Sequence, residues 1–457
     1  MNVVEPRVIS RKEHRISHRQ ISPNALRTLY RLHAHGFIAY LVGGCVRDLL
    51  LGRTPKDFDI GTNATPGQIK RLFRNCRLIG RRFRLAHLHF QDEIVEVSTF
   101  RGAAPASDEG EAEETGHGSR FVRHLKDEAG MVLADNVFGT PEQDALRRDF
   151  TINALAYDSA DSSVIDYSTG LTDLKDRLIR TIGDPRVRFT EDPVRMLRAV
   201  RFAASHDLVI ERSAWEGLCE LAPTIARVSP SRVYEEVQKL FLAGSARPAF
   251  TLLEKGSLLT ALFPALGPWL DADDRRLALI EASLGRLDEA YREGVPASLA
   301  LFLAAVFGSG VEEAALALHR EGVPYQQAME AVCSAFTKDL CKTVAIPGRV
   351  ALRLRAVLAL QASLRRLPTR RPASVAARPE FAEALVCLRL SAQSAPEHRA
   401  ALEWWEGFLA GNPEMTSPAP LAGAPAGKKR RKRRGGRRGR GRRRTGGPAG
   451  QNAPSEP

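Results

Sequence analysis

Four short motifs in the first half of the chain constrain its fold more strongly than any other feature. A glycine pair, two aspartates one residue apart, an Arg-Arg-Asp and an arginine-rich helix start follow one another in the segments 41–48, 56–59, 147–151 and 191–198. Each motif alone is common in proteins. Together, in this order, they predict a site that holds metal ions, a triphosphate and a base.

The glycine pair lies at the end of a short apolar segment. Residues 38–42 have the composition of a buried strand, which ends at Gly43 and Gly44. Glycines at this point let backbone N–H groups approach a phosphate closely, because no side chain intervenes. Arg47 follows where the next helix is expected to begin, and its guanidinium suits a phosphate. The alternative is a tight strand-to-helix turn that binds no ligand.

Asp57 and Asp59 are the predicted metal ligands. Residues i and i+2 of a strand point to the same face, so the two carboxylates should lie side by side, with Phe58 turned to the core. Like charges at this spacing repel unless a divalent cation neutralises them, and magnesium prefers such oxygen ligands. Two ions held there could activate an attacking hydroxyl and stabilise a leaving pyrophosphate. A solvated acidic turn is the alternative.

Most two-metal sites need a third carboxylate, and the sequence offers two candidates. Glu96 lies in the alternating segment 93–100, and Asp149 ends the Arg-Arg-Asp motif. Strand alternation does not choose between them. Glu96 is explained equally well as a polar residue on the outward face of a strand.

The fourth motif predicts a helix that Asp192 caps and Pro193 starts. Leu197 and Val200 would supply its buried side. Three arginines at three-residue spacing form a stripe on this helix, at Arg195, Arg198 and Arg201. Asp192 and Arg195 together could offer a base one acceptor and one donor. The alternative is a solvated arginine face without a ligand.

At this point the chain resembles a known family. The glycine pair, the Asp57/Asp59 pair and the segments 147–155 (RRDFTINAL) and 191–202 (EDPVRMLRAVRF) are similar to those of the class II nucleotidyltransferases of the DNA polymerase β superfamily. That group contains tRNA CCA-adding enzymes and bacterial poly(A) polymerases. The resemblance implies an α+β fold, in which a polymerase-β-like palm with a mixed sheet precedes an all-helical neck and body.

Three further segments resemble the poly(A) branch of the group. Residues 78–89 (LIGRRFRLAHLH), which include Arg81, Arg82 and Arg84, look like a segment that marks bacterial poly(A) polymerases. The segments 135–140 and 21–26 point to the same branch. Two alternatives remain open. One is a CCA-adding enzyme, and the other is an RNA-binding protein that has lost catalysis, against which the intact Asp57/Asp59 pair argues.

The resemblance implies a role for each matching residue. Asp57 and Asp59 would hold two magnesium ions, and Asp149 matches the third catalytic acid of the poly(A) branch. ATP would be the substrate, attacked at its α-phosphorus by the 3′-hydroxyl of single-stranded RNA, with release of pyrophosphate. The residues that would bind the nucleotide are Gly43, Gly44, Arg47, Arg148, Asp192, Arg195, Arg198 and Arg201.

Positive charge is concentrated near the carboxyl end. The chain has 67 Lys and Arg against 53 Asp and Glu, a net charge of +14. Residues 428–457 hold 13 of these cations and one acid, a charge of +12 that leaves +2 for the other 427 residues. Such a segment should be disordered, and it should bind RNA backbones without sequence preference. The predicted RNA-binding tail is centred on Lys428, Lys429, Arg430, Arg431, Lys432, Arg433 and Arg434.

Composition and periodicity divide the chain into successive regions. Leucines and alanines at three- and four-residue spacing predict helices from 172 to 412, and an Ala-, Gly-, Ser- and acid-rich segment predicts a mobile insertion at 102–130. The expected regions are an N-terminal extension (1–20), a catalytic head (21–183), a helical neck (184–249), a helical body (250–415) and a disordered Arg/Gly-rich tail (416–457).

The remaining features point to the cytoplasm, and a monomer is the default expectation. Six scattered cysteines without a Cys-x-x-Cys pair indicate neither a zinc site nor a disulfide framework. The first 20 residues do not resemble a signal peptide, and the most apolar run, 297–308, is too short to span a bilayer. His206-Asp207 is treated as an incidental pair, since a phosphohydrolase domain would need further metal ligands downstream. Trp404 and Trp405 are expected in a core or interface.

Overall fold

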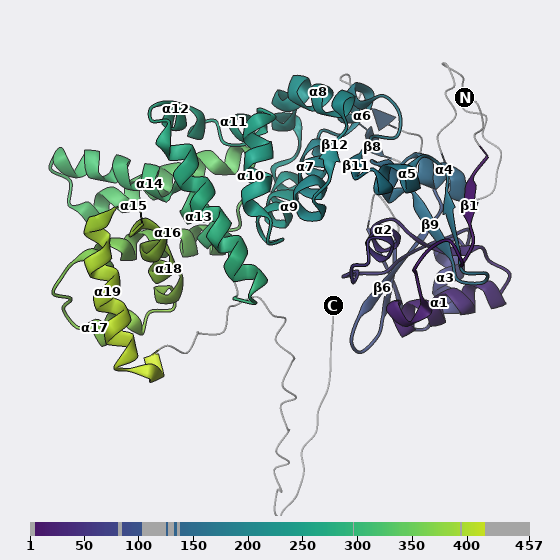
Figure 1. Cartoon of the computed structure of the whole chain (residues 1–457), viewed down its shortest axis with the longest axis horizontal. Helices are drawn as coiled ribbons and strands as arrows, with labels where there is room; N and C mark the ends of the chain where they lie inside the picture. Colours follow the sequence, from purple (N-terminus) through teal and green to yellow (C-terminus); the bar gives the residue numbers. More distant parts are fainter. Residues whose placement is uncertain are drawn as a thin grey trace, which may run out of the picture. The chain divides into compact units, whose positions relative to one another are not determined.

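The structure of the chain is a computed structural model (Figure 1). It describes residues 5–80, 85–102, 125–126, 132–134, 138–295, 297–393 and 395–415. All of these belong to one compact unit, Met1–Ser417. The arginines at 81, 82 and 84, the predicted RNA-binding tail, and the predicted insertion apart from Gly102 and a two-residue strand lie outside the described residues.

A mixed sheet of eight strands forms the centre of the head, in the order β1-β10-β9-β2-β3-β6-β5-β4. Strands β3 and β6 are parallel, and the other neighbouring pairs are antiparallel. In sheet order the strands are Arg7–Ile9, Ser163–Asp166, Leu155–Asp158, Ala39–Val42, Asp59–Thr62, Ile94–Thr99, Leu85–His89 and Cys76–Ile79. This sheet, followed by helices, confirms the predicted α+β fold. Four strands of two or three residues form two smaller pairs: β7 (Leu125–Lys126) with β8 (Val132–Ala134), and β11 (Leu178–Ile179) with β12 (Val209–Ile210).

Polar caps begin the helices of the head. The Ser22 hydroxyl accepts from the N–H groups of Asn24 and Ala25 at the start of α1, and Thr65 and Thr140 form capping boxes at the starts of α3 and α4. The helices of the head are α1 (Pro23–Ala34), α2 (Gly44–Leu50), α3 (Pro66–Leu72), α4 (Pro141–Leu146) and α5 (Gly170–Lys175), with a short 3₁₀ turn at Thr151–Asn153. Helix α2 follows β2 directly, as the glycine pair predicted.

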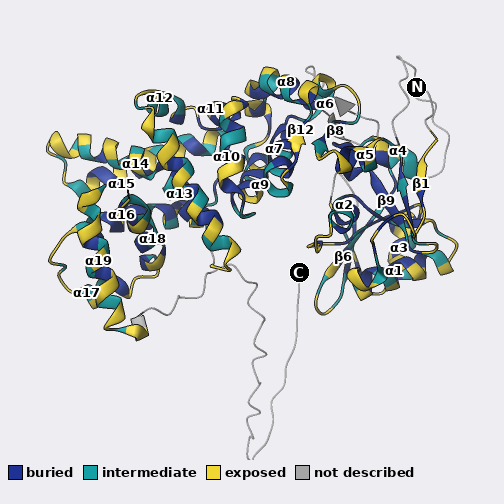
Figure 2. Cartoon of the chain, in the orientation of Figure 1, coloured by how far each residue is buried: buried dark blue, intermediate teal, exposed yellow. Residues whose placement is uncertain are grey.

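Burial is strongest in the middle strands of the sheet. Leu41 on β2, Ile60 on β3 and Tyr157 on β9 have no exposed surface, and the first three residues of β9 are buried (Figure 2). The central strands are therefore held from both faces, which fixes the positions of the loops at their ends.

From residue 185 onward the described chain is almost entirely helical. The helices are α6 (Pro185–Glu191), α7 (Val194–His206), α8 (Arg212–Leu221), α9 (Pro230–Phe241), α10 (Ala246–Lys255), α11 (Leu258–Leu262), α12 (Leu266–Asp271), α13 (Arg275–Arg292), α14 (Leu299–Arg320), α15 (Tyr325–Thr343), α16 (Gly348–Arg365), α17 (Pro372–Ala376), α18 (Phe381–Ser391) and α19 (Pro396–Ala410). The leucine and alanine spacing predicted this helical character. The exact boundaries between head, neck and body stay predictions.

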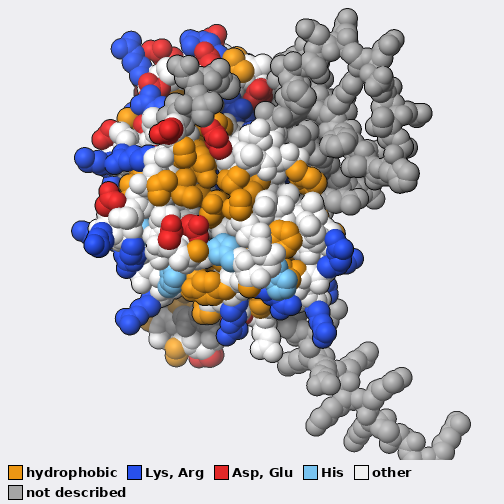
Figure 3. Space-filling model, turned by 90° about the vertical axis from the view of Figure 1, so that its right-hand side faces the viewer, with side chains coloured by type: hydrophobic (Ala, Val, Ile, Leu, Met, Phe, Trp, Pro, Cys, Tyr) orange, Lys and Arg blue, Asp and Glu red, His pale blue; other side chains and the backbone are white. Residues whose placement is uncertain are grey.

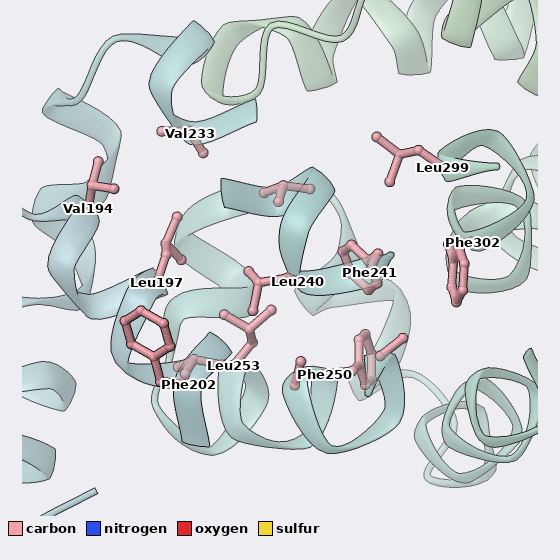
Figure 4. Packing of buried hydrophobic residues seen from close by; sticks show 14 of the residues in the cluster. Val194, Leu197, Phe202, Val233, Leu240, Phe241, Phe250, Leu253, Leu299 and Phe302 are labelled. Carbon is pink, nitrogen blue, oxygen red and sulfur yellow. The ribbon is translucent and has the colours of Figure 1, made fainter. Parts of the chain in front are cut away.

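An apolar core joins α7, α9 and α10. Leu197 and Phe202 of α7 lie toward Leu240 of α9 and Leu253 of α10 in Figure 4. Phe241, at the end of α9, lies 6.2 Å from Phe302 of α14 between ring centroids, so the same core continues into the body. Because α7 carries the predicted arginine stripe, this packing fixes the face that the stripe presents.

Helix α14 is the one helix of the described chain that is long and apolar enough to cross a membrane. However, 61% of its most apolar window is buried inside the protein, where it packs against α15 and α16. We therefore assign it to the core of the body. Trp405 also belongs to this core, as predicted, since it is fully buried and donates its indole N–H to the Leu364 carbonyl at 3.0 Å.

The prediction that Asp192 caps α7 is wrong. Helix α6 ends at Glu191 with Asp192 as its C-cap residue, and α7 begins at Val194 after Pro193, without a side-chain cap. The Asp192 carboxylate instead accepts a hydrogen bond from Arg232 of α9 at 2.8 Å. An ion pair to another helix therefore replaces the local cap, and it ties the α6–α7 corner to α9.

Figure 3 shows one face of the chain, on which Lys and Arg side chains stand separately around the rim. Apolar and histidine side chains gather nearer the centre of that face. This distribution agrees with the charge of only +2 outside residues 428–457. The described part of this face thus presents no continuous basic surface.

Candidate active site

A pocket of about 890 Å³ brings together all four sequence motifs. The predicted residues that line it are Gly44, Arg47, Asp57, Asp59, Arg148, Asp149, Asp192, Arg195, Arg198 and Arg201. Further lining residues come from α9 and the turn after it, among them Gln238 and Lys239. The pocket is therefore walled by the sheet and α2 on one side and by α7 and α9 on the other.

The two predicted metal ligands stand at the start of β3. The strand begins at Asp59, two residues after the exposed Asp57, and the intervening Phe58 is buried as predicted. Neither carboxylate makes a hydrogen bond or ion pair with the part of the chain that the structure describes. Burial, the charge of Glu96 and the charge of Asp57 raise the pKa of Asp59 to about 6, against some relief from Arg148. Acids held without partners in this way fit a divalent cation.

Glu96 lies directly beside Asp59 in the sheet. The two residues are partners in the register of the parallel strands β3 and β6, so their side chains share one face. His87, the partner of Glu96 on β5, places its Nε2 3.2 Å from the Glu96 carboxylate. Among described residues no group of three or more His, Cys, Asp or Glu side chains forms a complete metal site, so substrate or water oxygens would have to complete the coordination.

Asp149, the other candidate for a third carboxylate, is fully committed to protein partners. Its Oδ1 accepts from the Phe150 N–H at 2.9 Å and from Asn153 at 3.0 Å, and its Oδ2 accepts from the Arg198 Nε at 2.6 Å. Burial alone would raise the pKa of Asp149, but the charge of Arg198 and these hydrogen bonds lower it to about 2. Asp149 therefore holds Arg198 in the pocket wall as a permanent anion.

The glycine turn places Arg148 and Arg47 against the start of α2. Gly43 has φ 77° and ψ −131°, and a Cβ there would overlap the Arg148 guanidinium, so only glycine fits. Arg148 also bonds to Asp144 at 3.1 Å and to the Asn153 carbonyl at 3.3 Å. Arg47 is only 5% exposed and pairs with Asp48, while its Nη1 donates to Asn153 Oδ1 at 2.7 Å.

The arginine stripe on α7 is real, and each of its members has a partner. Arg195 donates to the Arg188 carbonyl at 2.8 Å, and Arg201 donates to the buried Glu236 of α9 at 2.9 Å. The ring of Phe202 lies beneath three guanidinium carbons: those of Arg47 at 4.7 Å, Arg198 at 5.4 Å and Arg201 at 4.3 Å from its centroid. Phe202 thus supports three cations at one wall of the pocket.

Asp192 and Arg195 both line the pocket, as predicted. The Arg195 N–H donates to the Asp192 carbonyl at 3.0 Å, but the side chains of the two residues have other partners. Asp192 Oδ2 accepts from Arg232, while its Oδ1 is buried without a partner among described residues. Arg195 is bonded to Glu191 as well as to Arg188. The acceptor and the donor predicted for a base are therefore held separately, each by its own neighbour.

Four residues of this site were missed in the sequence. Asp48 directly follows Arg47, and Phe202 ends the segment 191–202, so both had a local signal. Asn153 lies inside the segment 147–155, but its bond to Arg47, like the bond of Glu236 to Arg201, joins residues more than 30 positions apart, so the sequence did not reveal either contact. The side chains of His206 and Asp207 have separate partners, since His206 faces Asp48 and Asp207 pairs with Arg177.

Comparisons with known proteins match three parts of the chain to family models. "Poly A polymerase head domain" matches residues 39–180, "Probable RNA and SrmB- binding site of polymerase A" matches 207–270, and "Polymerase A arginine-rich C-terminus" matches 321–441. The Poly(A) polymerase I of Salmonella typhimurium is 41% identical over 411 residues, which are 89% of this chain and 86% of that protein. The Poly(A) polymerase I of Haemophilus influenzae is 38% identical over 89% of each chain.

CCA-adding enzymes are more distant in sequence and supply similar solved structures. The enzyme of Bacillus licheniformis is 35% identical over 258 residues, 56% of this chain and 58% of its own. The crystal structure of the Bacillus stearothermophilus CCA-adding enzyme in complex with CTP superposes with a TM-score of 0.58, at 27% identity, over 86% of this chain and 84% of that one. Similarity to poly(A) polymerases thus extends through the body, whereas similarity to this CCA-adding sequence covers about half of the chain.

Proposed function

The chain belongs to the poly(A) polymerase I family of nucleotidyltransferases, and from that premise we propose that it transfers AMP from ATP to the 3′-hydroxyl of RNA, with release of pyrophosphate. The observation that carries the proposal is the identity of 41% to a poly(A) polymerase over 89% of the chain. We propose the bacterial cytoplasm as its location, a single chain as its working form, and the division into head, neck and body as its domain structure.

Asp57 and Asp59 are the proposed magnesium ligands, with Glu96 as the third carboxylate. The support is the pairing of Asp59 on β3 with Glu96 on β6, the place of Asp57 two residues before Asp59, and the absence of a described partner for either aspartate. Magnesium bound there would activate the 3′-hydroxyl and neutralise the leaving pyrophosphate. Asp149 serves the site differently in this proposal, because its oxygens are bonded to Arg198, Asn153 and the Phe150 N–H.

The triphosphate is proposed to lie between the glycine turn and α7. The turn places Gly44 at the pocket, while Arg148, Arg198 and Arg201 line it with charge. Asp149, Glu236 and Phe202 hold Arg198 and Arg201 in place before the nucleotide arrives, and Asp144 holds Arg148. Little covalent chemistry is required of the protein, since orientation and fixed charge lower the barrier to phosphoryl transfer.

The base is proposed to lie at Asp192 and Arg195. Asp192 Oδ1 is a buried acceptor without a described partner, and adenine carries an exocyclic amino group that could donate to it. Arg232 fixes the other oxygen of that carboxylate. Because cytosine also carries an amino group, this contact alone does not explain the choice of ATP over CTP. RNA is proposed to reach the pocket past Gln238 and Lys239 and to be retained by the basic tail.

The test is primer extension with the purified protein. An oligo(A) primer is incubated with magnesium and each nucleotide separately, and the products are separated on a gel. We expect a long ladder with ATP alone, which Asp57→Ala abolishes. Addition of C and A to a trimmed tRNA, with no ladder on oligo(A), would establish a CCA-adding enzyme instead. Extension of neither primer would leave RNA binding as the function.

A further inference from the structure

His206, the last residue of α7, makes a contact that the proposed chemistry does not use. Its side chain is 10% exposed, and its Nε2 lies 3.0 Å from Oδ1 of Asp48 on α2. The ring also packs edge-on against Phe202, at 6.0 Å between centroids. His206 thus connects the helix that carries the arginine stripe with the helix that follows the glycine turn.

Asp48 passes this contact on to Arg47. The same Oδ1 accepts from the Arg47 Nε at 2.9 Å and lies 2.8 Å from its Nη2. Arg47 then bonds to Asn153 and lies over the Phe202 ring. Burial opposes ionisation of Asp48, but the hydrogen bond from His206 and the charge of Arg47 keep the pKa of Asp48 below its usual value. The acceptor at the centre of this network is therefore a carboxylate.

The hydrogen on His206 can be assigned from its neighbours. A carboxylate only accepts, so Nε2 must carry the hydrogen that faces Asp48. Burial lowers the pKa of His206, which makes the neutral ring the main form near neutral pH. Its Nδ1 lies 2.8 Å from the Ser205 hydroxyl, whose hydrogen also has the Arg201 carbonyl within reach at 2.7 Å. The ring is held in one tautomer and one orientation.

A second contact reinforces the same junction. Arg53, in the loop after α2, donates to the Ser205 carbonyl at 2.7 Å. Two bonds therefore join α2 and its loop to the last turn of α7, beside the pocket. The glycine turn and the arginine stripe lie on opposite sides of this junction, so its geometry sets the distance between the two groups that must grip one triphosphate.

We propose that His206 is a positioning residue for nucleotide binding, which acts through Asp48 and Arg47 to fix the start of α2 relative to the arginines of α7. The inference rests on the proposed function for the identity of the nucleotide. His206 does not touch the reacting atoms in this arrangement. Its loss should therefore weaken the binding of ATP far more than it slows the transfer step.

The test compares two substitutions of similar size. His206→Leu keeps apolar contact with Phe202 but removes the donor to Asp48, whereas His206→Gln retains an amide N–H that can reach Asp48. We expect the leucine variant to raise the KM for ATP about ten-fold, with kcat within about two-fold of wild type. The glutamine variant should stay within about three-fold in KM. Asp207→Asn, at an exposed neighbour, is the control and should match wild type.

Equilibrium binding of ATP with magnesium, measured by calorimetry, gives a readout that does not depend on RNA extension. The dissociation constants should follow the same order as the KM values. If the leucine variant unfolds at a much lower temperature, His206→Asn replaces it, because its shorter amide is polar but does not reach Asp48. An unchanged KM and affinity in the leucine variant, or an equal loss in the leucine and glutamine variants, would overturn the proposal.

The proposed function and the role of His206 can be contradicted separately. A wild-type protein that binds ATP but extends no RNA contradicts the proposed function, while the binding series still decides the role of His206. A wild-type protein that extends RNA with a leucine variant of normal KM contradicts the role of His206 alone. A wild-type protein that does not bind ATP contradicts both.

Discussion

At the scale of single residues, the site keeps its acids in two contrasting states. Asp59 is held beside Glu96 without a described partner, and its pKa is raised to about 6, whereas Asp149 is enclosed by donors and its pKa is lowered to about 2. Asp59 therefore has the environment of a proposed metal ligand, whereas Asp149 is a permanently charged partner of Arg198. Substitution should separate the two roles.

Asp59→Asn should abolish activity without loss of stability. The change removes a proposed metal ligand, and it also removes a half-buried charge that is repelled by Glu96. We expect RNA extension to fall about a thousand-fold. The melting temperature should be unchanged or higher by about 1–3 °C. Extension assays and calorimetry on the same preparation test this, and a fall of several degrees would show that Asp59 has a structural role.

Asp149→Asn should destabilise the protein in a pH-dependent way. The pKa of Asp149 is lower in the folded chain than the value near 3.9 expected when unfolded, so its contribution of about 2 kcal/mol is complete above that value. This contribution is lost as the pH falls through about 2, and about half of it should be gone at pH 3.

The measurement for Asp149 is the difference in melting temperature between wild type and variant at pH 6 and at pH 3. The difference should be smaller at the lower pH. Asp207→Asn, at an exposed position, should show no such trend. An equal difference at both pH values would mean that the Arg198 pair contributes nothing to stability.

At the scale of elements, the turn between β2 and α2 has the least freedom to vary. Gly43 and Gly52 both have positive φ, at 77° and 72°, but a Cβ would overlap Arg148 at the first position and meet nothing within 4 Å at the second. An alanine at either position should cost about 1–3 kcal/mol from backbone strain. Comparison of the two alanine variants therefore separates the effect of backbone strain from the effect of displacing Arg148.

Gly43→Ala should reduce activity about ten-fold or more, because the displaced Arg148 lines the pocket. Gly52→Ala should lose a similar amount of stability and keep nearly wild-type kinetics. Steady-state kinetics with melting curves on both variants give the comparison. Equal activity in the two variants would indicate that the position of Arg148 does not matter to the reaction.

The elements also show what the sequence could predict. Asp59 at the start of β3, the helix after the glycine pair and the arginine stripe on α7 follow from local spacing, and all appear in the structure. Two features were beyond local reasoning. Asp192 looked like a cap because its partner, Arg232, lies 40 residues later, and the place of Glu96 beside Asp59 follows only from the sheet order, which puts β6 next to β3.

At the scale of the whole molecule, charge and chemistry are separated along the chain. The residues outside 428–457 carry only +2, while the 13 Lys and Arg near the carboxyl end supply almost all of the net charge. The head holds the acids of the candidate site, and the tail is proposed to attract phosphate backbones. Catalysis and retention of RNA should therefore respond to different changes.

Truncation after residue 415 should leave kcat at saturating oligo(A) within about two-fold, because no residue of the pocket is removed. Affinity for RNA at low ionic strength should fall at least about ten-fold, and the plot of log affinity against log salt should become shallower by several units. Binding assays over a salt series, with kinetics on the same variant, test this. An unchanged salt dependence would show that the tail does not bind RNA.

The two sides of the predicted insertion meet in a way that matters for protein engineering. Arg101 and Phe138 form a bridge, the Gly139 N–H donates to the Phe100 carbonyl at 2.9 Å, and a Cβ on Gly139 would overlap Gly102. Because the chain leaves the sheet and returns to it at these paired residues, the length of the intervening segment should have little effect on the stability of the sheet. A foreign domain could therefore be inserted between these two paired ends without changing the register of the strands in the head sheet.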